Sequence, residues 1–143
     1  MLGRKSYTQE ELERARGLIG AQLAVYDALV QTVNDAGSDA KSAAAVEAFE
    51  REFFNSLLLV LDRFFVHRLR VSAGKDGNPV NEVELLADSL LTNNGVMRGN
   101  NVVKYEPETA VVGVQIGDRI SLNSEQFRRL SAAFFAEIAK RFM

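Results

Sequence analysis

The chain has 143 residues, of which 47% are hydrophobic and 25% charged, and its formal net charge is −2. It has no cysteine and one histidine, His67. Disulfides and most zinc or di-iron centres are therefore excluded, because those centres need several thiolate or imidazole ligands. The length predicts one domain over residues 1–143, and the weak net charge gives no general basic field for nucleic acid. We expect neither a cofactor nor a bound metal.

The amino terminus and the most apolar run of the chain indicate neither a secretory signal nor a membrane span. Residues 1–5 are basic but lead into a polar stretch, whereas a secretory signal continues into an apolar segment. The most apolar run, residues 56–61, is closed by Asp62 and Arg63, far short of the roughly 18 to 20 residues of a membrane span. We therefore expect a cytoplasmic protein without a membrane partner.

Three segments carry the start signal of a helix, in which a capping residue is followed three positions later by an acid or an amide. Hydrophobic residues recur at three- and four-residue steps after each signal, and again after the break at residues 35–39. The three signals are the pairs Thr8 with Glu11, Asn81 with Glu84, and Asn123 with Gln126. The patterns predict helices at about 9–34, 40–71, 82–93 and 124–142.

The segment before the last helix has a different period. Beyond Asn94 and Gly95, which form a natural helix stop, hydrophobic residues alternate with a period of two, and Gly117 and Asp118 form a two-residue turn signal. The pattern predicts three strands, at about 102–105, 110–116 and 119–122. The expected fold class is α+β and mainly helical: two long antiparallel helices, one short helix and one C-terminal helix packed with a small three-stranded antiparallel meander.

The second helix carries two apolar stripes, which makes its apolar arc unusually wide. The main stripe runs through Val46, Phe49, Phe53, Leu57, Val60, Phe64, His67 and Val71. The second stripe consists of Phe54, Leu58, Leu61 and Phe65. Such an arc needs cover in two directions, so either the monomer packs in three layers or a partner covers one side.

The basic end of the second helix is the first candidate site. Arg63 and His67 are four residues apart and share a helix face, so His67 is a weak candidate for a general acid or base and Arg63 for stabilising charge on an anionic substrate. A purely structural role for these residues is favoured over a reactive pair. His67 falls on an apolar stripe, and cations in the last turn of a helix suit the helix dipole.

The second candidate site is an asparagine-rich region. Amide side chains flanked by glycine can bind sugars, bases or phosphates. The asparagines are Asn78, Asn81, Asn93, Asn94, Asn100 and Asn101. Turn formation and capping are the favoured explanation of these asparagines. Combined with the basic end, they give a candidate ligand-binding set of Arg63, Arg68, Arg70, Lys75, Arg98, Asn94, Asn100 and Asn101. A third candidate, a cation site at Glu47, Glu50 and Asp62, is less favoured than a solvated helix face.

Two functions follow from these features. The leading hypothesis is a non-catalytic interaction or assembly protein that acts as a homo-oligomer, with a homodimer as the simplest form, because the second helix has excess phenylalanines and no catalytic constellation is recognisable. The alternative is a binder or processor of an anionic ligand, either RNA or a nucleotide, through the basic end of the second helix.

Overall fold

The computed structural model describes residues 7–37, 39–69 and 74–142, without the side chains of residues 66–69 and 142. The described residues form four helices and no strand, so the prediction of an α+β fold is wrong and the fold is all-helical. The helices are α1 (Gln9–Asp35), α2 (Ala40–Leu69), α3 (Pro79–Thr92) and α4 (Ser124–Phe142).

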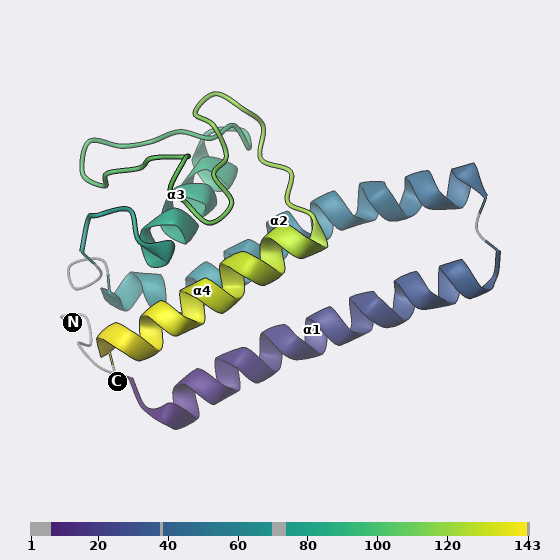
Figure 1. Cartoon of the computed structure of the whole chain (residues 1–143), viewed down its shortest axis with the longest axis horizontal. Coiled ribbons are helices and arrows are strands. Elements are labelled where there is room, and N and C mark those ends of the chain that lie inside the picture. Colours follow the sequence, from purple (N-terminus) through teal and green to yellow (C-terminus); the bar gives the residue numbers. More distant parts are fainter. Residues whose placement is uncertain (1–6, 38, 70–73, 143) are drawn as a thin grey trace.

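The helices pack in three layers (Figure 1). The long helices α1 and α2 form an antiparallel hairpin, and its turn projects past the beginning of α4. Helices α2 and α4 each contact the three other helices, whereas the described parts of α1 and α3 do not contact each other. The middle layer is therefore formed by α2 and α4, with α1 on one side and α3, covered by residues 93–123, on the other.

Two of the predicted capping boxes are present and position α1 and α4. The Thr8 side chain accepts the Glu11 N–H at 3.1 Å, and the Glu11 carboxylate accepts the Thr8 N–H at 2.8 Å. Asn123 and Gln126 make the same reciprocal pair at 2.8 and 3.0 Å. Each box satisfies N–H groups that the first helical turn leaves without a partner.

The third capping box is wrong by three residues. Helix α3 begins at Pro79, and its cap is Asn78, whose side chain accepts the N–H groups of Val80 and Asn81. Proline suits the first helical position because its missing N–H would have no partner there. Asn81 is a buried helix residue instead, and its side chain donates to the carbonyl of Gly74 at 3.1 Å.

The two apolar stripes of α2 have different surroundings. Phe54, Leu58, Leu61 and Phe65, the second stripe, are almost completely buried, with exposed fractions of 0 to 2%. Phe54 packs on Phe127 of α4, and Phe65 packs on Phe134 of α4. On the other stripe Phe49 and Val60 are each 43% exposed. The three layers therefore cover α2 on most sides and leave part of its main stripe in solvent.

The middle predicted strand is replaced by a loop that binds a carboxylate. Glu82 of α3 is 1% exposed, and its carboxylate accepts the N–H groups of Val111, Val112 and Gly113 at 2.8 to 3.2 Å. Gly113 has φ of +73°, which breaks extended backbone. Because these N–H groups point at one side chain, they cannot form a ladder with a neighbouring strand, and the prediction of a strand at 110–116 is wrong.

The other two predicted strands also fail. Lys104, in the segment 102–105, donates its N–H to the carbonyl of Lys75 in the loop before α3. In the segment 119–122, the backbone bonds go to the residues after α3: Ile120 donates to Gly95, and an isolated bridge joins Val96 to Arg119. The segment pairs locally with the end of α3 and not with a neighbouring strand, so no meander forms.

Replacing Glu82 with glutamine tests the role of its carboxylate in holding this segment. An amide offers one acceptor oxygen in place of two and adds donors that face N–H groups. We expect Glu82→Gln to lower the free energy of unfolding by about 2–4 kcal/mol in denaturant titration. Glu106→Gln, an exposed change in the same segment, is the control and should stay within about 0.5 kcal/mol. Equal effects of the two changes would contradict the proposed role.

Candidate functional site

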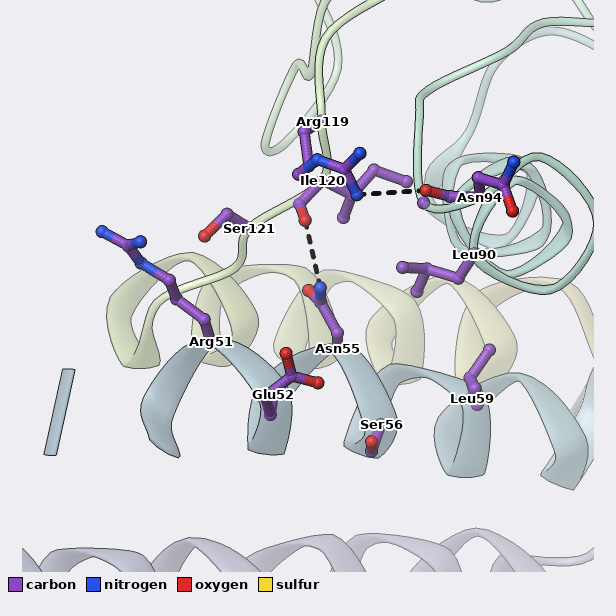
Figure 2. Close-up of a pocket in the computed structure, with 11 residues that line it drawn as sticks. Arg51, Glu52, Asn55, Ser56, Leu59, Leu90, Asn94, Arg119, Ile120 and Ser121 are labelled. Atoms are coloured by element: carbon purple, nitrogen blue, oxygen red, sulfur yellow. Dashed lines mark hydrogen bonds between the residues drawn. The ribbon is translucent and has the colours of Figure 1, made fainter. Parts of the chain in front are cut away.

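A polar cavity of about 560 Å³ lies where the middle of α2 meets the end of α3 and the segment leading to α4. Its lining residues are shown in Figure 2 and come from three parts of the chain. They are Arg51, Glu52, Asn55, Ser56 and Leu59 of α2, Leu90, Asn94 and Gly95 at the end of α3, and Arg119, Ile120 and Ser121.

Asn55 forms the floor of this cavity and joins α2 to the segment before α4. Its amide nitrogen donates to the carbonyl of Ile120 at 3.0 Å, the bond drawn in Figure 2, and its oxygen accepts the N–H of Leu122 at 3.2 Å. A side-chain amide has one acceptor and two donors, so it can match a carbonyl and an N–H at once. Asn55 thus has a structural task.

The cations of the cavity also have partners within the protein. Arg51 pairs with Glu47 at 2.6 Å, one helical turn away. Arg119 donates to the carbonyl of Asn94 at 3.1 Å, which caps the negative end of α3. The lining contains no histidine and no second carboxylate beside Glu52. This arrangement holds α2, α3 and the segment together, and it presents no pair of groups suited to acid–base or nucleophilic chemistry.

The described residues of the predicted basic site come from three different parts of the chain. Arg63 is an exposed residue of α2 and Lys75 an exposed residue of the loop before α3. Arg98 pairs with Asp88 of α3 at 3.1 Å. At 1.5 Å per residue, Asp88 lies roughly 14 Å along the helix from Pro79, the first residue of α3. The side chains of His67 and Arg68, and all of Arg70, lie outside the described residues. The anionic-ligand site and the Arg63–His67 pair therefore stay predictions.

The asparagines have local backbone tasks. Asn94 adopts φ of 54° and, with Gly95 at 75°, forms the expected left-handed stop of α3. Asn100 accepts the N–H groups of Val102 and Val103 at 2.9 and 2.8 Å, while Asn101 is exposed. Among the predicted ligand residues whose side chains the structure describes, only Asn94 lines the polar cavity.

The carboxylates of α2 do not gather into a metal site within the described residues, where no group of three or more possible ligands occurs. Glu47 holds Arg51, and Glu50 accepts the N–H of Ser124 at the start of α4 at 2.7 Å. Asp62 is half-buried and lies more than three helical turns beyond Glu50 along α2. Burial raises the pKa of Tyr26 to about 12, and the carboxylate of Glu50, which accepts the Tyr26 hydroxyl, adds to the rise.

An apolar groove runs between α1 and α2. It has a volume of about 330 Å³. No charged side chain is among its lining residues, which are Leu18, Ile19, Gln22, Phe53, Ser56, Leu57 and Val60. We call the surface around it the hairpin face and define it by Leu18, Gln22, Val25 and Leu29 of α1 with Phe49, Phe53, Ser56 and Val60 of α2.

The hairpin face exposes large apolar side chains from both helices. Leu18 and Leu29 are 46% and 43% exposed, and Val25 is 68% exposed. The α1 half of this face was not predicted, because only the core stripe of α1 was considered. A signal was present: Leu18, Val25 and Leu29 recur at helical spacing beside that stripe.

Comparison of the chain with protein-family models, with curated proteins and with solved structures finds no match. Among the described helices, none is long and apolar enough to cross a membrane.

The role of Asn55 can be tested with a leucine of similar volume. Asn55→Leu leaves the Ile120 carbonyl and the Leu122 N–H without their partner. We expect the free energy of unfolding to fall by about 1–3 kcal/mol in denaturant titration. The same substitution at exposed Asn101 is the matched control and should change stability by less than about 0.5 kcal/mol. If Asn55→Leu is as mild as the control, Asn55 does not hold the segment.

The tyrosines predict how stability changes in alkali. Burial also raises the pKa of Tyr105 to about 12, with the charges of Glu82 and Glu108 adding to it. Because an unfolded chain releases phenolic protons near pH 10, the stability contributed by Tyr26 and Tyr105 is complete below pH 10. It is lost as the pH rises towards about 12. Denaturant titrations at several pH values should show a shallower alkaline loss for Tyr105→Phe than for the original chain, whereas identical profiles would rule out the shift.

Proposed function

We propose that this protein is a non-catalytic assembly protein that acts as a homo-oligomer, with the hairpin face as the surface that binds a second copy. The single observation that carries the proposal is this face, which combines uncharged groove lining with five strongly exposed apolar side chains. Contiguous exposed apolar surface of this kind is typical of binding surfaces and costly to leave in water.

The hairpin is long enough for a second copy of the chain to pack along it. Helix α1 has 27 residues, so at 1.5 Å per residue it is about 40 Å long, and two adjacent helices are roughly 20 Å wide. The hairpin face itself is about 17 Å long and covers roughly 340 Å², so the roughly 800 Å² of a standard specific interface requires contact along the whole hairpin, beyond the apolar face. Two hairpins packed in this way would form a four-helix arrangement.

The spacing of the face also favours helical packing. The exposed residues of each helix recur at steps of four, three and four, from residue 18 to 29 and from residue 49 to 60. A repeat averaging 3.5 residues keeps one stripe facing a neighbouring helix, as in coiled coils. Helix α1 contacts α2 and α4, and Leu18, Val25 and Leu29 of its second stripe are still 43 to 68% exposed, so this stripe is available for another helix.

Val25 offers the sharpest test, because it is the most exposed side chain of the face and its replacement should leave the fold intact. We expect the original chain to be a dimer in light scattering coupled to size exclusion. Val25→Glu should raise the dissociation constant at least about tenfold, since a buried charge without a partner opposes association.

The neighbouring alanine provides the matched control. Ala24 is also exposed, but it points about 100° away from Val25 on the helix, outside the hairpin face. Ala24→Glu introduces the same charge in the same helix and should leave the dissociation constant unchanged. A strict monomer of the original chain at high concentration would sink the proposal, and so would equal effects of the two substitutions.

A further inference from the structure

The hairpin face consists of four layers, and one of the layers is polar. Helices α1 and α2 run in opposite directions. Residues with increasing numbers along α1 therefore lie beside residues with decreasing numbers along α2. The groove confirms this register, since it joins Leu18 and Gln22 of α1 to Val60, Ser56 and Phe53 of α2. The layers are Leu18 with Val60, Gln22 with Ser56, Val25 with Phe53, and Leu29 with Phe49.

The polar layer does not lie at the centre of the face. It is the second of the four layers, and the other three contain only apolar residues. An amide or a hydroxyl that leaves water without gaining a hydrogen-bond partner opposes association. The position of Gln22 and Ser56 therefore distinguishes between the ways in which two copies can pack.

Two faces can be related by a two-fold axis in two ways. With the axis parallel to the helices, each layer meets its own equivalent, and α1 lies opposite α2 of the second copy. With the axis perpendicular to the helices, the order of layers is reversed. Gln22 then lies opposite the partner's Val25, and Ser56 lies opposite the partner's Phe53, which leaves both polar groups against apolar side chains.

We infer that the two copies pack about a two-fold axis parallel to α1 and α2, so that Gln22 of each copy hydrogen-bonds Ser56 of the partner subunit. This inference rests on the proposed dimer and specifies its arrangement. A glutamine amide both donates and accepts, and a serine hydroxyl does the same, so the pair can satisfy itself. A single polar layer in an apolar helical interface is a known means of selecting one register, at some loss of affinity.

The rim of the face does not oppose this arrangement strongly. It places Arg14 near the partner's Arg63, two like charges at the same height of the hairpin. Arg14 is 67% exposed and pairs with its own Glu10 at 2.9 Å, and Arg63 is exposed as well. Solvent and salt screen a repulsion between such groups.

Disulfide trapping can read the arrangement directly, because the chain has no cysteine of its own. Single variants Leu18→Cys, Leu29→Cys and Val60→Cys are mixed in pairs and oxidised mildly, and mixed disulfides are measured by mass spectrometry. We expect a mixed disulfide between Leu18→Cys and Val60→Cys chains, and only background between Leu18→Cys and Leu29→Cys chains. Ala24→Cys mixed with Val60→Cys measures the background, since residue 24 lies outside the face.

Each outcome has a distinct meaning. A disulfide between the Leu18→Cys and Leu29→Cys chains, with none between the Leu18→Cys and Val60→Cys chains, overturns the parallel arrangement but keeps the dimer. A dimer in light scattering that traps neither pair also overturns the arrangement. A monomer that traps neither pair overturns the proposed function itself.

A second variant tests whether the polar layer selects the arrangement. Gln22→Leu combined with Ser56→Ala makes all four layers apolar. In that background we expect association to tighten by at least about tenfold, and the Leu18→Cys to Leu29→Cys disulfide to appear beside the first. If trapping remains confined to the first pair, Gln22 and Ser56 do not set the arrangement.

Discussion

Helix α2 has more apolar circumference than its neighbours cover, and this constraint shapes the rest of the molecule. One stripe, Phe54 to Phe65, is buried, with Phe54 and Phe65 packed on phenylalanines of α4, and Leu57 is buried as well. In the remaining stripe, Phe49 and Phe53 stack against Tyr26 of α1, yet Phe49 and Val60 are each still 43% exposed. The two explanations of the wide apolar arc, packing in three layers and cover by a partner, are therefore compatible. The monomer packs in three layers, and the hairpin face is still exposed.

The helices could be predicted because their signals are local. The capping boxes at Thr8 and Asn123 specify hydrogen bonds within four residues, and the apolar period of α1 depends on its own sequence. The start of α3 was missed for an equally local reason. Asn78 and Asn81 are both suitable caps, and Pro79 at the first helical position decides for the earlier one.

The strands were predicted wrongly because alternation describes side chains and does not say where backbone groups find partners. Val112, Val114 and Ile116 alternate as they would in a strand, yet the N–H groups beside them bind the carboxylate of Glu82. Glu82 lies some thirty positions earlier in the chain, and its sequence context suggests an exposed acid at the start of a helix. Long-range partners of this kind leave no mark on a local period, and the same holds for Asn55, whose partners lie 65 and 67 positions away.

The outer half of the α1–α2 hairpin connects the fold to the proposed assembly. Tyr26 is packed by Phe53 and Phe54, and the adjacent Asp27 pairs with Arg128 of α4. Beyond this point Val30, Val33 and Val46 are only half-buried. Helices that bury little apolar surface gain little stability from packing. A second hairpin laid along the same face would bury Val25, Leu29 and Phe49 and so support the outer half as well. In the proposed dimer, association and the packing of the hairpin depend on the same apolar surface.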